Sequence, residues 1–185
     1  MPLLAGPHPT RGITMNMTGH LRNGLLCALF LVAAPVMAEQ KSAQDQHFVS
    51  EASAAGMAEI DAAKLALKKS QSADVKTFAQ HIIDDHEKAN ATLKSLAAKH
   101  QLQLADSASL TSQAKAKVLD VREESFDAAY ANNQVSAHEE AVKVFTDAAN
   151  HAADADIKNF AQQTLPVLQQ HLEMARDLVK AHPSS

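Results

Sequence analysis

The stretch ADVKTFAQ at residues 73–80 returns later in the chain as ADIKNFAQ at residues 155–162, identical at six of eight positions. The second residue of each copy is an aspartate, which complements the helix dipole when it lies in the first turn. Ser72 and Asp154, which precede the two copies, are both residue types that cap helix N-termini. We therefore expect each copy to open the second helix of an antiparallel hairpin. The alternative, a shared helix-start sequence without a structural repeat, fits so long a match less well.

The hydrophobic pattern around the two copies is helical. Apolar residues recur at helical spacing over residues 43–70, 72–100, 121–150 and 154–182. Residues 101–120 are polar, small or weakly apolar and interrupt this pattern. Two similar hairpins joined by so long a connection predict an all-α four-helix bundle of ferritin-like topology, with residues 101–120 as the crossover between the second and third helices. Pro166 lies inside the fourth segment and should kink that helix.

Composition supports a single helical domain and excludes two other classes of protein. Residues 39–185 contain 31 alanines, two prolines and a single glycine, Gly56. So few turn-forming residues cannot supply the hairpins of an all-β fold. The same 147 residues carry 15 basic and 21 acidic side chains, a net charge of −6. An acidic chain with a single tyrosine is not expected to bind nucleic acid.

The N-terminal segment has the pattern of a secretory signal peptide. Arg22 precedes an apolar run at residues 25–34, and the sequence VMA at residues 36–38 then provides a signal-peptidase site. Ten apolar residues are about half of a ~20-residue membrane span, which argues against a membrane anchor. We therefore expect residues 1–38 to be cleaved after Ala38. The start codon is left open among Met1, Met15 and Met17.

Export has consequences for the rest of the chain. Cleavage after Ala38 removes Cys27, the single cysteine, so the mature protein is expected to have neither disulfides nor thiol chemistry. The mature domain, residues 39–185, is expected to lack a transmembrane span. Its predicted location is the periplasm, with association to the outer membrane left open.

Four blocks of the mature domain resemble a known family. They are FVSEASAAGMAEIDAAKLA from Phe48, VKTFAQHIIDDHEKANATLKSLAAKH from Val75, FDAAYANNQVSAHEEAVKVF from Phe126 and LPVLQQHLEMA from Leu165. Their order and content are similar to the bacterial domain-of-unknown-function family numbered 4142, over nearly the whole mature domain. The resemblance implies a bacterial envelope location and a ferritin-like fold, and it implies no activity. The family pattern has Asp before both core histidines, whereas here Asp85 precedes His86 but Ala137 precedes His138.

Three histidines, His86, His138 and His171, lie on the apolar stripes of three different predicted helices. Glu59 lies beside the stripe of the first helix. Glu59 precedes the first expected hairpin turn by 13 residues, and His86 follows it by 14. His138 precedes the second turn by 16 residues, and His171 follows it by 17. Because a helix rises ~1.5 Å per residue, each pair lies at nearly one height, and four polar groups converge inside the bundle if the hairpins are in register.

One interpretation of these residues is a metal site. Imidazole is a good ligand for zinc, copper or iron, and a carboxylate from Glu59 or Asp85 could complete the coordination. Asp85 could also orient His86, its neighbour in the sequence. A di-iron ferroxidase centre is not expected, because it needs Glu three residues before His. The residues at those positions are Ile83, Val135 and Leu168.

The other interpretation, which the sequence alone favours, is that the histidines are neutral core residues. Each buried ring then needs a hydrogen-bond partner. Asp85, Glu59, Asp127 and Gln134 are the candidates. Asp127 reaches the face of His138, because eleven residues make about three helical turns.

The functional expectation follows from these two interpretations. The chain has no Gly-rich phosphate loop and no nucleophile motif, so an enzyme is the least supported class and no catalytic residue is assigned. The first hypothesis is an exported envelope protein with a non-catalytic binding or stress-related structural role, no cofactor, and either another envelope protein or a second copy as partner. The second is a metal-binding bundle that uses His86, His138 and His171 together with Glu59 or Asp85.

Overall fold

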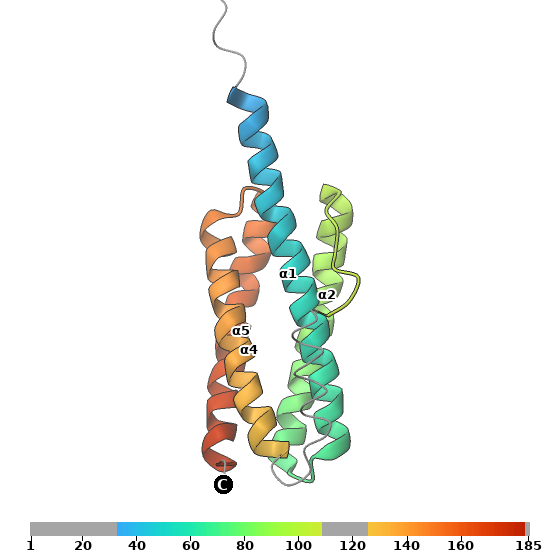
Figure 1. Cartoon of the computed structure of the whole chain (residues 1–185), viewed down its shortest axis with the longest axis vertical. Coiled ribbons are helices and arrows are strands. Elements are labelled where there is room, and N and C mark those ends of the chain that lie inside the picture. Colours follow the sequence, from blue (N-terminus) through green and yellow to red (C-terminus); the bar gives the residue numbers. More distant parts are fainter. Residues whose placement is uncertain (1–32, 109–125, 184–185) are drawn as a thin grey trace, which may run out of the picture. The chain divides into compact units, whose positions relative to one another are not determined.

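The computed structural model describes residues 33–108 and 126–183, with side chains from residue 43 onward. Its four helices are α1 (Ala33–Lys69), α2 (Ala73–His100), α4 (Phe126–His151) and α5 (Ala155–Ala181). α1 packs along α2 and α4 along α5, and the two hairpins meet through contacts of α1 with α4 and of α2 with α5 (Figure 1). The predicted all-α four-helix bundle is therefore confirmed.

Both copies of the repeated stretch open the second helix of a hairpin, as predicted: α2 begins at Ala73 and α5 at Ala155. Asp154 caps α5, since its carboxylate accepts hydrogen bonds from the backbone N–H groups of residues 156 and 157. Ser72 is the N-cap residue of α2, as predicted, but its side chain does not make the cap hydrogen bond. The Val75 N–H in the first turn donates to Asp74 Oδ1 instead, and the N–H of Ser72 donates to Ser70 Oγ.

The connection after α2 returns along the bundle. α2 ends at His100, and its C-cap residue Gln101 has a φ of 57°, in the left-handed region that terminates helices. The chain then runs back beside α1, where the N–H of Ala105 donates to Ser53 Oγ over 2.8 Å. α4 starts at the end of the bundle where α2 also starts, so these two helices run parallel, as in a ferritin-like bundle (Figure 1). Residues 109–120 of the predicted crossover lie outside the described residues.

Two equivalent ion pairs join the ends of α2 and α5. His100 at the end of α2 bonds Asp156 in the first turn of α5 over 2.9 Å. His182 just after α5 bonds Asp74 in the first turn of α2 over 3.0 Å. In each hairpin the histidine follows the aspartate by 26 residues. The repeat therefore extends beyond its eight-residue match to the contacts that hold α2 and α5 antiparallel.

A buried carboxylate on α1 holds the turn between α4 and α5. Asp45 is 5% exposed, and its two oxygens accept the backbone N–H groups of Ala153 and Asp154 at 3.0 and 2.9 Å. These groups would otherwise be unsatisfied donors at the start of a helix. The first helix thus fixes the last turn of the bundle.

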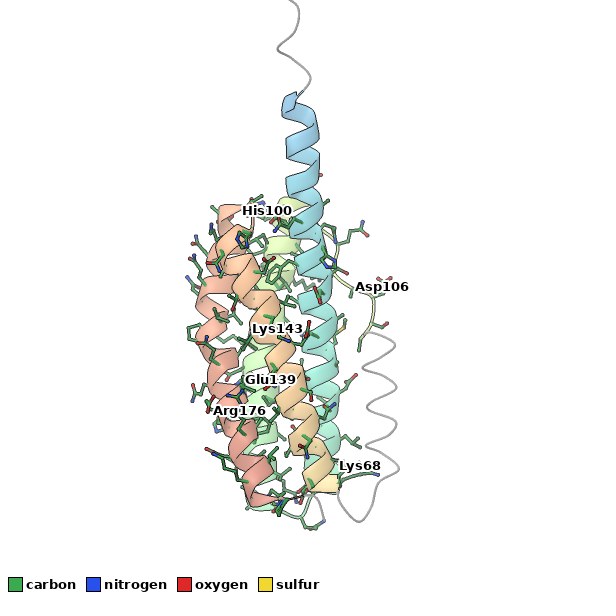
Figure 2. All side chains as sticks on the ribbon, turned by 60° about the vertical axis from the view of Figure 1, so that its left-hand side comes forward. Lys68, His100, Asp106, Glu139, Lys143 and Arg176 are labelled. Atoms are coloured by element: carbon green, nitrogen blue, oxygen red, sulfur yellow. The ribbon has the colours of Figure 1, made fainter. Side chains whose placement is uncertain are left out.

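The core consists of two apolar clusters, one toward each end of the bundle. One surrounds Ile82 and Tyr130, and the other surrounds Leu93 and Ile157. Charged side chains such as Glu139, Lys143 and Arg176 lie on the outer surface (Figure 2), where Arg176 bonds Glu139 across α4 and α5. A belt of buried polar side chains separates the two apolar clusters.

α1 begins before the predicted cleavage point and continues through Ala38. The compact unit of the structure starts at Ala33. Cleavage after Ala38 stays a prediction. Within the described ranges, no helix has a stretch that is both long enough and apolar enough to cross a membrane.

Candidate metal centre

Three imidazole rings meet in the middle of the bundle. His86 comes from α2, His138 from α4 and His171 from α5. Their ring centroids form a nearly equilateral triangle with sides of 5.8, 5.7 and 5.4 Å. The sequence-based prediction that these three side chains lie at one height is therefore confirmed.

Hydrogen bonds fix which nitrogen of two of the rings carries the lone pair. His138 Nδ1 lies 2.9 Å from the backbone carbonyl oxygen of Gln134, so Nδ1–H donates and Nε2 keeps a lone pair. His171 Nε2 lies 3.0 Å from Asp85 Oδ2, so Nε2–H donates and Nδ1 keeps a lone pair. Metal-binding histidines characteristically donate their second N–H to a carbonyl or carboxylate in this way.

The nitrogens that carry these lone pairs are buried. His86, His138 and His171 are 8%, 1% and 2% exposed. Within the described part of the chain, His86 Nε2, His138 Nε2 and His171 Nδ1 have no hydrogen-bond partner. Leaving a buried polar atom unsatisfied costs roughly 1–3 kcal/mol, so three of them in one place call for an explanation.

Burial also keeps the rings neutral. Desolvation, followed by the nearby His138 and His171 rings, lowers the pKa of His86 to about 3. Desolvation lowers the pKa of His138 to about 4, against the opposing bond to the Gln134 carbonyl. The pKa of His171 is lowered by burial too, although its bond to Asp85 works in the other direction. Neutral imidazole is the form that binds metals.

The geometry is close to that of a coordination sphere. One ligand atom from each histidine lies within 4.8 Å of the other two. Three nitrogens bound to one ion at ~2.1 Å would lie about 3.5 Å apart. The rings would therefore move inward by about 1 Å at most, which side-chain rotation can supply.

A cavity of about 190 Å³ lies against the three histidines and is lined by all four helices. Glu59 lines it from α1 and is 8% exposed, so the fourth predicted residue lies in the same interior. Glu59 is not part of the group of ligand atoms within 4.8 Å of one another. The structure thus brings three of the four polar groups together and places the carboxylate in the wall of the cavity.

Two expectations about hydrogen-bond partners need correction. Asp85 bonds His171 on α5 rather than its sequence neighbour His86, because successive side chains on a helix point about 100° apart. His138 bonds the backbone carbonyl of Gln134 rather than its side-chain amide. The Gln134 amide is itself fully buried, and neither of its polar atoms has a partner among residues 33–108 and 126–183.

Buried polar groups continue along α4 beyond the belt, and of these the sequence analysis named Asp127 and Gln134 but missed Tyr130. Asp127 Oδ1 and the Tyr130 hydroxyl are buried in the same way as the Gln134 amide. Together with His138, these residues are spaced by three, four and four positions, which places them on one helical face. That spacing is a signal in the sequence. Burial, and then the neighbouring Glu59, raise the pKa of Tyr130 well above its ordinary value.

A second group with metal-ligand side chains was not predicted. His100, Asp154 and Asp156 bring one ligand atom each within 4.8 Å of the others. Here both ring nitrogens of His100 are already bonded, Nδ1 to Asp154 at 3.0 Å and Nε2 to Asp156 at 2.9 Å. The Lys99 ammonium also contacts Asp156. This group is a satisfied ion-pair network that clamps two helix ends.

Comparison with known proteins supports the fold. The family model for a domain of unknown function, DUF4142, matches residues 31–178. A search of curated proteins gives no match. A solved DUF305 fragment from Deinococcus radiodurans superposes with a TM-score of 0.67 at 15% identity, covering 75% of this chain and 96% of that one. CopM in its Cu(I)-bound form superposes with a TM-score of 0.65 at 16% identity, covering 76% and 98%.

Proposed function

This chain belongs to the DUF4142 family, which has no assigned function, and we propose that it binds one copper ion through His86 Nε2, His138 Nε2 and His171 Nδ1. The observation that carries the proposal is the set of three buried imidazole nitrogens without partners in the described structure, on three rings that each bring a ligand atom within 4.8 Å of the other two. A bound ion would satisfy all three at once. These observations favour the second hypothesis drawn from the sequence, a metal-binding bundle, over the first one, a binding or structural protein without a cofactor.

The donor set narrows the choice of ion. Three neutral nitrogens without a carboxylate among them disfavour Mg²⁺ and Ca²⁺, which prefer oxygen ligands. Among divalent first-row metals, copper binds such sites most tightly. Cu(I) is satisfied by three nitrogens, whereas zinc needs a fourth ligand, which would have to be water or a group such as Glu59. The Cu(I)-bound neighbour CopM has the same fold, although an identity of 16% transfers the fold alone.

The surroundings of the histidines favour binding of a cation. Asp85 on the outside of the bundle bonds His171, so one ring is held by a carboxylate and its basicity is raised. Glu59 adds a second carboxylate in the cavity wall. Both groups stabilise positive charge at the centre of the triangle.

The test is the metal content of the untagged protein after loading with Cu(I) and removal of excess ion. We expect one copper per chain in wild type, and a large loss in His86→Ala. Met57→Ala, in α1 and outside the triad, is the matched control and should keep one copper. Sub-stoichiometric copper in wild type, or equal copper in wild type and His86→Ala, would refute the proposal. Equimolar zinc in the same experiment decides between the two metals.

The location of the protein is a separate proposal. We infer export to the periplasm from the signal-peptide pattern that ends at Ala38. N-terminal sequencing of the protein from a periplasmic extract should give Glu39 as the first residue. Recovery of an uncleaved chain from the cytoplasm would contradict it.

A further inference from the structure

The proposed copper site borders an open space, and this space has a chemical character of its own. The cavity of about 190 Å³ is much larger than the space that one water needs, which is about 10–15 Å³ on the same measure. Apolar protein cavities of about 150 Å³ are known to bind benzene or xenon. A copper ion held by three histidines therefore lies beside room for another small molecule.

The wall of the cavity selects against anions. Its apolar part includes Leu93, Phe145, Phe160 and Leu168. Its charged part consists of carboxylates, with Glu51 and Glu140 toward the surface and Glu59 buried. Among the described residues that line it, lysine and arginine are absent. An anion entering this space would lose hydration and meet negative charge.

We infer that the cavity admits a small uncharged molecule to an open coordination position on the metal held by His86, His138 and His171. This inference rests on the proposed function, since it requires the ion to be bound. Under this inference, the bound metal can exchange a small ligand at its open position and is not fully enclosed by protein ligands. Carbon monoxide is the probe of this chemical class, because it binds Cu(I) and fits a small apolar space.

The experiment loads the full chain with Cu(I) without oxygen and adds carbon monoxide. We expect one sharp infrared C–O stretching band and one carbon monoxide per copper, and excess azide should leave the band in place. Copper-loaded protein without the band would overturn this inference and leave the proposed function intact. Failure to bind copper at all would refute the proposed function. Displacement of carbon monoxide by azide would overturn the inference that the cavity admits uncharged molecules and excludes anions.

Cavity-filling variants tie the bound molecule to this space. Ala89 on α2 and Ala141 on α4 line the cavity, and neither of them is a proposed metal ligand. Ala89→Leu and Ala141→Leu should each keep one copper and reduce carbon monoxide binding at least tenfold. Ala91→Leu adds the same side chain to the exposed face of α2 and should bind like wild type. Unchanged binding in both cavity variants would overturn the inference, and two positions keep the test valid if one variant fails to fold.

Discussion

The described part of the bundle contains two compact groups of metal-ligand side chains that are chemically opposite. In both groups the ligand atoms lie within 4.8 Å of one another. At the surface, both nitrogens of His100 are bonded to aspartates, and lysine neutralises part of the charge. In the interior, each of three imidazoles keeps one nitrogen without a partner in the described structure. Proximity of ligand types is therefore a weak criterion, and unsatisfied lone pairs are the stronger one.

The largest expected difference between the two groups is their response to acid. The unfolded chain protonates His86 and His138 below about pH 6.5, whereas the folded chain keeps them neutral down to about pH 3 and about pH 4. The unfolded state then binds more protons, so the free energy of unfolding falls as the pH decreases through this window. Each histidine contributes about 1.4 kcal/mol per pH unit. Urea unfolding of the metal-free protein at about pH 7 and about pH 5 should differ by several kcal/mol.

The variant His138→Gln should lose between a third and a half of that pH dependence, because one of the three buried rings with a lowered pKa is gone. If the free energy of unfolding had the same pH slope in wild type and in His138→Gln, the buried rings would not be the source of the pH dependence.

The next effect is stabilisation by copper. Free copper at about one hundred times its Kd should raise the free energy of unfolding by about 2.7 kcal/mol. The same gain is expected in His100→Ala, since the surface group takes no part. His171→Ala should gain much less. Thermal unfolding with and without copper measures all three proteins, and a loss of the gain in His100→Ala would place the ion at the surface group instead.

A smaller effect is expected from Asp85, which orients His171 without contacting the ion. Asp85→Asn should weaken copper binding by about 10–100-fold, the usual result of changing a carboxylate that supports a metal-binding histidine. Asp84→Asn removes a neighbouring exposed carboxylate that bonds Gln80 and should leave the Kd unchanged. Competition against a Cu(I) chelator gives both constants. Equal constants for the two variants would mean that the bond from His171 to Asp85 has no part in binding.

The smallest effect is expected at the surface group. Asp154→Ala removes the cap of α5 and should lower the free energy of unfolding by about 1 kcal/mol, with unchanged copper stoichiometry. Asp147→Ala, in an exposed pair with His151 on α4, should change it by less. Urea unfolding of both variants checks this. A loss of copper in Asp154→Ala would argue that the surface group is the metal site.

The sequence was sufficient for the fold because the signals were local and repeated. The copies at residues 73–80 and 155–162 mark two helix starts, and counting from the turns placed three histidines at one height. The hydrogen-bond partners could not be predicted in this way. The bond between Asp85 and His171 joins different hairpins, so it depends on how α2 and α5 are rotated against each other. The side-chain cap by Ser72 does not form because the carboxylate of Asp74 accepts the Val75 N–H that Ser72 would have bonded.

Asp45 has a consequence for how the chain reaches its final state. This buried carboxylate on the first helix is satisfied by backbone groups more than one hundred residues later in the sequence, at Ala153 and Asp154. In a nascent or translocating chain that still lacks these two N–H groups, burial of the Asp45 carboxylate would leave its oxygens without hydrogen bonds, which is costly. The part of α1 around Asp45 therefore cannot reach its final packing until the hairpin of α4 and α5 has formed. A fragment that stops before residue 153 should show fast amide hydrogen exchange around Asp45, even where the first hairpin is otherwise protected.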